Sequence, residues 1–189
     1  MIKDFAAGII KKHLKFEPTA SQEKAIDLLS EFIVNPIRED IFILNGYAGT
    51  GKTTLISACI KTMKDLKIQS VLMAPTGRAA KVLSKYAGKE ASTIHKKIYK
   101  QKSSTSDYFV LDTNLHSNTI FIVDEASMIS DNQTESPFGS GHLLVDLITY
   151  VYNNKGCALI LTGDVAQLPP VGLDYSPALE SQYIEQHFL

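Results

Sequence analysis

The 189-residue chain has no tryptophan, only two cysteines, only two arginines and a formal net charge of −1. No apolar run approaches the ~18 residues that a helix needs to span a bilayer. The N-terminal stretch MIKDFAAGIIKKHLKF is interrupted by charges and lacks the apolar core of a signal peptide. Cys59 and Cys157 each sit in apolar sequence, and we expect buried, reduced thiols. These absences exclude a disulfide-stapled or membrane-spanning chain and favour a cytoplasmic protein with no membrane partner.

Hydrophobic residues make up 44% of the chain, and they gather in short runs. Four runs rich in Ile, Val, Leu and Phe lack polar alternation, which is typical of strands buried on both faces of a parallel sheet: 41–44, 70–74, 119–123 and 157–161. Helical spacing of apolar residues covers 21–34, 52–66, 77–86 and 142–152, with Thr19 as the N-cap of the first helix. This alternation predicts one α/β domain with three layers, α/β/α, around a mainly parallel sheet.

Two polar segments interrupt the alternation. Residues 97–118 include a short apolar stretch, 108–111, and predict a small hairpin or an excursion outside the sheet. Residues 130–141 contain Pro137, Gly139 and Gly141 and predict a long flexible loop. Loops of this length in compact domains are usually functional or disordered.

Residues 46–53, GYAGTGKT, match the phosphate-binding pattern G-x-x-x-x-G-K-[ST] between an expected strand and an expected helix. Glycines let successive backbone N–H groups turn toward phosphate oxygens, and the positive end of the following helix dipole adds attraction. Lys52 can reach the β- and γ-phosphates of a nucleotide, and the Thr53 hydroxyl can complete a Mg²⁺ shell. The expected nucleotide contacts are Gly46, Ala48, Gly49, Thr50, Gly51, Lys52, Thr53 and Thr54.

The apolar run at 119–123 ends in two acids, Asp124 and Glu125. This places Asp124 at the carboxyl end of a strand, beside the crevice in which open α/β sheets bind ligands. We expect Asp124 to hold Mg²⁺ and Glu125 to orient and deprotonate the attacking water. Without the phosphate-binding loop, a solvated acidic turn would be the preferred interpretation. Together the two motifs predict a P-loop NTPase.

Six motifs, in order, resemble those of the superfamily 1 DNA helicases, and specifically the RecD/Dda-like 5′-to-3′ branch. They lie between Phe16 and Gly172: a Q-motif at 19–22, motif I at 46–53, motif Ia at 74–80, a DNA-contacting motif at 93–96, motif II at 124–127 and motif III at 163–172. The resemblance implies a RecA-like ATP-binding domain 1A over residues 16–189, preceded by an N-terminal extension over residues 1–15. It also implies ATP and Mg²⁺ as cofactors.

Two glutamines have expected roles in this scheme. A carboxamide complements the N7 and N6 groups of adenine, so Gln22 could select ATP, although an ordinary surface glutamine is the commoner case. The resemblance makes Gln167 a sensor of the γ-phosphate, and the alternative is a polar turn residue before Pro169. The implied catalytic residues are therefore Lys52, Glu125 and Gln167.

The resemblance also implies contacts with single-stranded DNA through residues 74–96. The expected contacts, which would bind sugar–phosphate oxygens without reading sequence, are Pro75, Thr76, Gly77, Arg78 and His95. Residues 77–102 carry eight basic side chains and one acidic side chain, a formal charge of +7. A solvated lysine-rich face is the alternative for this block, and a structural role is the alternative for His95.

Residues 97–118 occupy the place of the small 1B subdomain, which splits the duplex in this helicase branch. Tyr108 and Phe109 are candidate wedge residues, or else they pack the insertion onto the domain. Motifs IV to VI and the second RecA-like domain are absent from the sequence. We therefore expect a monomeric fragment of a longer helicase, which alone hydrolyses ATP weakly and unwinds nothing.

Two other functions compete with this interpretation. One is a small P-loop kinase, and the other is a non-hydrolysing, ATP-gated binding module. A kinase would need a lid of arginines, and the chain's two arginines argue against it.

Overall fold

A computed structural model describes residues 2–36, 40–103, 106–131, 137–167, 169–170 and 172–188. Its centre is a five-stranded sheet whose described strand pairs are all parallel, in the order β1-β7-β6-β2-β3. The strands are β1 Ile41–Asn45, β2 Gln69–Ala74, β3 Ala91–Thr93, β6 Thr119–Val123 and β7 Ala158–Gly163. The four predicted strands are confirmed to within two residues at each end. The short edge strand β3 was not predicted.

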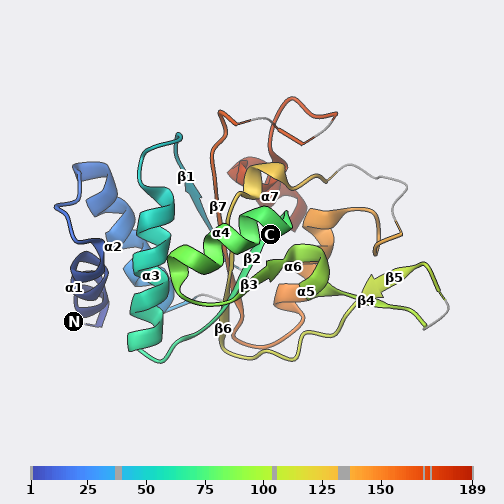
Figure 1. Cartoon of the computed structure of the whole chain (residues 1–189), viewed down its shortest axis with the longest axis horizontal. Coiled ribbons are helices and arrows are strands. Elements are labelled where there is room, and N and C mark those ends of the chain that lie inside the picture. Colours follow the sequence, from blue (N-terminus) through green and yellow to red (C-terminus); the bar gives the residue numbers. More distant parts are fainter. Residues whose placement is uncertain are drawn as a thin grey trace.

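Helices cover both faces of the sheet (Figure 1). Alternate residues of β6 divide the core, because Ile120 and Ile122 pack into one apolar cluster while Phe121 and Val123 pack into the other. The first cluster holds α1 Ile2–Leu14, α2 Ala20–Val34, α3 Lys52–Asp65 and α4 Gly77–Ala87. The second holds α5 Ile94–Ile98, α6 Leu143–Tyr152 and α7 Ser181–Phe188, with the 3₁₀ turns η1 Ala126–Met128 and η2 Pro177–Leu179. The predicted three-layer α/β/α domain is confirmed.

Capping at the start of α2 agrees with the sequence pattern. The Thr19 side chain accepts a hydrogen bond from the Gln22 N–H, and the Gln22 side chain accepts one from the Thr19 N–H. This reciprocal capping box satisfies two backbone donors at the helix start.

Residues 2–14 form a helix that belongs to the core. Helix α1 buries Ala6, Ile10 and Leu14, and it packs against both α2 and α3. Burying three apolar side chains of this size contributes several kcal/mol, at about 25 cal/mol per Å² of apolar surface. Helix α1 therefore contributes to the stability of the domain that follows it.

The insertion at 97–118 contains a separate two-stranded antiparallel sheet, β4 Tyr99–Gln101 and β5 Phe109–Leu111, as the sequence predicts. The hairpin projects away from the N-terminal helices (Figure 1). In the predicted loop at 130–141, residues 132–136 lie outside the described residues, whereas 137–141 pack against the hairpin. Among the helices described, none is long and apolar enough to cross a membrane.

Candidate functional site

The motif-bearing segments follow four neighbouring parallel strands at their carboxyl ends. The phosphate-binding loop follows β1, residues 164–167 follow β7, Asp124 and Glu125 follow β6, and residues 75–78 follow β2. Because these strands are parallel and adjacent, all four segments lie along one edge of the sheet, where open α/β sheets bind ligands.

The loop after β1 needs glycine at two positions. Gly49 and Gly51 have φ values of +78° and +89°, in the left-handed region that favours glycine. A Cβ atom on Gly51 would lie 2.8 Å from Nε2 of Gln22. Gly51 is also the N-cap of α3, so the loop leads directly into a 14-residue helix whose N-terminus attracts anions.

Lys52 folds back onto the loop that precedes it. Its ammonium group donates hydrogen bonds to the backbone carbonyls of Gly46 and Tyr47. The Thr50 hydroxyl donates to the same Tyr47 carbonyl at 2.7 Å. These carbonyls hold the ammonium group at the mouth of the loop, from which it can exchange partners with phosphate oxygens.

A cleft of about 560 Å³ joins two of the three catalytic candidates, Glu125 and Gln167, whereas Lys52 lines a separate, smaller hollow. The cleft is lined by residues of all four segments: Thr53, Thr54, Thr76, Arg78, Ala79, Val82, Tyr86, Asp124, Glu125, Met128 and Gln167. Thr53, Asp124, Glu125 and Gln167 are thus brought together from segments as far apart in the chain as α3 and the turn after β7. The pair Asp124–Glu125 and the end of the phosphate-binding loop share one cavity.

Asp124 is a buried carboxylate, 9% exposed. Burial raises its pKa to about 6, and the charge of Glu125 adds to this increase, whereas a backbone hydrogen bond and the charge of Lys52 oppose it. The Asp124 N–H donates to the Met73 carbonyl at 3.1 Å, which fixes the end of β6 against β2. Carboxylate and hydroxyl oxygens are ligands that Mg²⁺ accepts, so Asp124 and Thr53 fit the expected metal.

Glu125 leaves the strand in an unusual backbone conformation. Its φ and ψ angles, 57° and 38°, are left-handed, which few residues other than glycine adopt. This conformation costs about 1–3 kcal/mol. Lys15, Lys67 and Asn118 also have positive φ values, but of these four residues Glu125 is the one that lines the cleft. The turn redirects the chain into η1 while the side chain of Glu125 lines the cleft.

Gln22 lies beside the phosphate-binding loop at a second, smaller hollow of about 230 Å³. Its carboxamide oxygen accepts from the Thr19 N–H, and its Nε2 donates to the Thr50 carbonyl at 3.0 Å. Both halves of the carboxamide are therefore engaged within the chain. To bind an adenine base, Gln22 would have to give up its hydrogen bond to the Thr50 carbonyl. Base binding by Gln22 would therefore release a contact of the phosphate-binding loop.

Part of the predicted DNA-binding set lies in the nucleotide cleft itself. Thr76 caps α4, and its hydroxyl accepts from the Ala79 N–H at 3.2 Å. Thr76 and Arg78 both line the cleft, while Pro75 and Gly77 flank them at the same strand end.

The sequence interpretation missed three cleft residues, Val82, Tyr86 and Met128, which are 45%, 55% and 48% exposed. Val82 and Tyr86 continue the four-residue spacing that starts at Arg78, and that spacing was the available signal.

His95 is placed elsewhere. Its ring lies 5.0 Å from that of Phe138 and 5.8 Å from that of Tyr99, and burial lowers its pKa. It does not line the nucleotide cleft. A half-buried, neutral imidazole among aromatic rings fits the structural alternative, and the predicted DNA contact stays a prediction.

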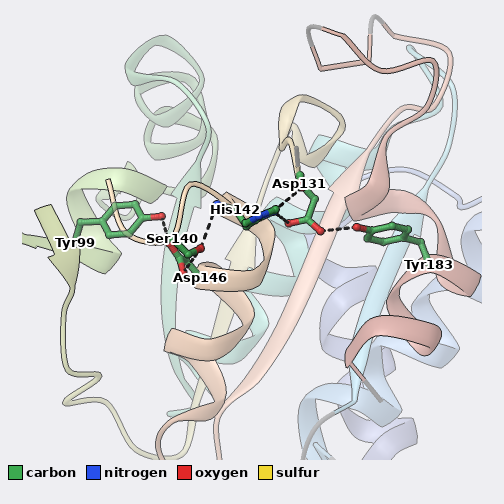
Figure 2. Close-up of polar contacts among 6 residues, drawn as sticks. All are labelled: Tyr99, Asp131, Ser140, His142, Asp146 and Tyr183. Atoms are coloured by element: carbon green, nitrogen blue, oxygen red, sulfur yellow. Dashed lines mark hydrogen bonds and ion pairs between the residues drawn. The ribbon is translucent and has the colours of Figure 1, made fainter. Parts of the chain in front are cut away.

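Figure 2 shows a polar network in which Tyr99 and Ser140 converge on Asp146. The buried carboxylate of Asp146 on α6 accepts from the Tyr99 hydroxyl at 2.7 Å, and from both the N–H and the hydroxyl of Ser140 at 2.9 Å. His142 donates from its own N–H to the Ser140 hydroxyl. We call Tyr99, Phe138, Ser140 and Asp146 the loop anchor, since together they fix the hairpin side of the domain to α6.

The fold and the cleft together define a P-loop NTPase domain. Residues 30–173 match the family model of an AAA domain, and the chain belongs to this family of nucleotide-binding domains.

Its relatives include helicases much longer than this chain. Over 132 residues it is 33% identical to the ATP-dependent RecD2 DNA helicase of Deinococcus radiodurans, a match covering 69% of this chain and 16% of the relative. Over 176 residues it is 31% identical to the ATP-dependent DNA helicase dda of Enterobacteria phage T4, covering 90% and 36%. The chain thus spans well under half the length of these relatives. The resemblance to RecD/Dda-like helicases is confirmed as a distant relationship.

A solved structure agrees on the fold. The crystal structure of Pif1 helicase from Candida albicans matches with a TM-score of 0.51 at 20% identity, over 82% of this chain and 34% of that one.

Proposed function

We propose that this chain is the first motor domain of an ATP-dependent 5′-to-3′ DNA helicase, which binds and hydrolyses ATP with Mg²⁺ and works with a second RecA-like domain of a longer protein. The observation that carries the proposal is the single cleft lined by Thr53, Asp124, Glu125 and Gln167. Each of these residues has the chemistry that one part of phosphoryl transfer to water requires.

The chain's own residues divide the work as follows. Lys52 exchanges the loop carbonyls for β- and γ-phosphate oxygens. Thr53 and Asp124 offer oxygens to Mg²⁺, which when bound neutralises charge on the phosphates. Glu125 accepts a proton from the attacking water, and Gln167 donates to the γ-phosphate.

The position of Thr76 and Arg78 favours a helicase over a small kinase. Both follow β2, where a hydroxyl and a guanidinium suit phosphate oxygens of a nucleic-acid strand, and both line the nucleotide cleft. Because both residues line the cleft, a shift of either on DNA binding would change the surroundings of the bound nucleotide. The partly exposed apolar side chains of Val82, Tyr86 and Met128 in the same cleft provide a surface on which a second lobe can close.

The test is ATP hydrolysis by the 189-residue chain with and without single-stranded DNA. We expect slow turnover, tighter nucleotide binding when DNA is present, and at least a 10²-fold loss of turnover in Glu125→Gln, as for removal of a general base, roughly 10²–10⁴ in rate. Glu125→Gln should still bind ATP. Glu17→Gln, which makes the same change at an exposed position, is the matched control.

Other outcomes point to other functions. Phosphoryl transfer to a small acceptor that ignores DNA would indicate a kinase. ATP binding without turnover, unchanged by Glu125→Gln, would indicate a gated binding module.

A further inference from the structure

A third concave region lies at the opposite end of β2, away from the nucleotide cleft. It is a hollow of about 700 Å³ where α3 and α4 end and β2 begins. Lys61, Lys64, Lys67 and Lys89 line it, together with the apolar side chains of Ile60 and Ile68. Because β2 is six residues long, the two sites are separated by about 17–20 Å along the strand.

Among the residues that the structure describes, no acid lines this hollow. Within the described part of the chain, no carboxylate forms an ion pair with Lys61, Lys64 or Lys67. The nearest acid along α3, Asp65, is paired with His13 at 2.8 Å. Several unpaired ammonium groups around one hollow repel each other, and a bound polyanion would relieve that repulsion.

Lysines at the ends of helices have an ordinary explanation, since they complement the negative end of the helix dipole. That explanation covers Lys64, in the last turn of α3. Lys67 and Lys89 each lie one residue beyond a helix C-cap, so the dipole also reaches them, but the ammonium group of Lys89 bonds elsewhere. The Lys89 ammonium donates to the carbonyl and the hydroxyl of Ser70, at 2.7 and 2.8 Å, so it is held at the rim of the hollow and away from the carbonyls that end α4.

The basic surface continues along the sheet edge. A neighbouring hollow of about 410 Å³ shares Ser70 and Lys89 with the first, and adds Lys96 and Lys97 on α5, with Glu90 as the acid in its lining. The two hollows therefore form an elongated path with six lysines and one glutamate, which we call the lysine track: Lys61, Lys64, Lys67, Lys89, Lys96 and Lys97. An extended path with repeated cations suits an extended anion with repeated charges better than a compact one.

We infer that the lysine track binds the sugar–phosphate backbone of a nucleic-acid strand, at a site separate from the nucleotide cleft and from residues 75–78. The proposal takes the class of its ligand from the proposed function. Its residues lie outside the helicase motifs apart from Lys96, and outside the expected DNA-contacting stretch 74–96 apart from Lys89 and Lys96. Binding there is independent of base sequence and weakens steeply with salt.

The test is the salt dependence of binding of a labelled single-stranded oligonucleotide to the 189-residue chain, followed by fluorescence anisotropy. The variant is Lys61→Gln/Lys64→Gln/Lys67→Gln. The control, Lys12→Gln/Lys24→Gln/Lys155→Gln, removes the same charge from exposed positions elsewhere. The slope of log K against log salt is negative, and loss of three phosphate contacts on a single strand should reduce its magnitude by about 2. Binding at low salt should weaken about ten-fold or more. The control should keep the wild-type slope, and both variants should bind ATP as the wild type does.

An Arg78→Ala variant separates this inference from the proposed function. A reduced slope in the lysine variant but not in the control supports the track, whatever Arg78→Ala does. Equal slopes in the lysine variant and the control overturn it, and weaker binding by Arg78→Ala in that case leaves the proposed DNA edge standing. A wild-type chain that binds ATP but no oligonucleotide overturns both.

Discussion

Two aspartates with similar burial, Asp124 and Asp146, have opposite surroundings. They are 9% and 6% exposed. The carboxylate of Asp146 accepts three hydrogen bonds, one from Tyr99 and two from Ser140. The carboxylate of Asp124 faces a cleft of about 560 Å³, and burial raises its pKa to about 6. The fold uses three lone pairs of Asp146, whereas the carboxylate of Asp124 accepts a backbone hydrogen bond from Glu125 and otherwise faces the cleft.

The same contrast extends to the surroundings of each aspartate. Next to Asp124, Glu125 has a left-handed backbone, and in the described part of the chain the buried hydroxyls of Ser127 and Thr162 have no hydrogen-bond partner. In the loop anchor, ring packing and hydrogen bonds support each other. Unfavourable local features thus lie beside the cleft, whereas the contacts of the anchor stabilise the fold.

The largest expected effect is at Gly139, which packs against Tyr99 and Asp146 of the loop anchor. It has a φ of +53°, and an added Cβ would overlap the Asp146 carboxylate and lie 2.5 Å from the Tyr99 ring. Gly139→Ala should lower the free energy of unfolding by about 3 kcal/mol or more, from strain and from loss of the network. Urea unfolding measures this. Gly88→Ala is the control, because Gly88 has a similar φ of +63° and no neighbour within 4 Å, and it should lose only about 1 kcal/mol. Equal losses at the two glycines would mean that the anchor contributes little.

Asp124→Asn should act in the opposite direction and stabilise the nucleotide-free protein. The folded pKa of about 6 exceeds the ordinary value of 3.8, so between these pH values the folded state holds a proton that the unfolded state has lost. The wild type therefore loses stability as pH rises from about 4 to about 6. Removing the charge should raise the free energy of unfolding by about 1–3 kcal/mol at pH 7.5, at 1.36 kcal/mol per unit of pKa. At pH 4 it should change the free energy of unfolding very little.

The measurement for Asp124→Asn is urea unfolding of both proteins across this pH range, without Mg²⁺ or nucleotide. A gain that does not change with pH would contradict the assignment to the Asp124 carboxylate. A loss of stability at neutral pH would place Asp124 in the same class as Asp146.

Asp146→Asn should be destabilising by about 1–3 kcal/mol, since the new amide group must oppose a donor from Tyr99 or Ser140. Urea unfolding at pH 7.5, beside Asp124→Asn, compares the two buried aspartates directly. Tyr99→Phe removes one of the three donors without adding an unfavourable contact. Its free energy of unfolding should therefore fall by less than that of Asp146→Asn. If Asp146→Asn were neutral, the three hydrogen bonds would not be what stabilises the loop.

Much of the nucleotide edge could be predicted because its signals are local. Continuous apolar runs mark the buried strands, and the glycines before Lys52 mark a turn that only that residue type readily adopts. The charge block at 77–102 shows what local signals miss. In the fold, the basic residues of this block lie in different places. Arg78 lines the nucleotide cleft, Lys100 pairs with Asp112 at 2.9 Å, and Lys89 lines a hollow together with lysines of α3.

Contacts between segments that are distant in the chain account for other features that the sequence did not predict. Asp146 lies 47 residues from Tyr99, and nothing in either sequence context indicates that they meet. Thr19 is correctly predicted as the N-cap of α2, yet the bond from Gln22 to the Thr50 carbonyl depends on how α2 packs beside the phosphate-binding loop. Strand β3, with three residues, is too short to leave a periodic signal.

The smallest expected difference concerns two adjacent aromatic residues of the hairpin. Phe109 stacks on Phe138 with centroids 4.6 Å apart, and its N–H and carbonyl pair with Pro137 and Gly139. Tyr108 is 67% exposed. Phe109→Ala should therefore cost about 1–2 kcal/mol of stability, and Tyr108→Ala less than about 0.5 kcal/mol. Both interpretations of the pair, wedge and packing, can then be tested residue by residue, with oligonucleotide affinity measured beside urea unfolding. Weaker binding by Tyr108→Ala at unchanged stability would make Tyr108 a nucleic-acid contact, whereas a stability loss as large as that of Phe109→Ala would add it to the anchor.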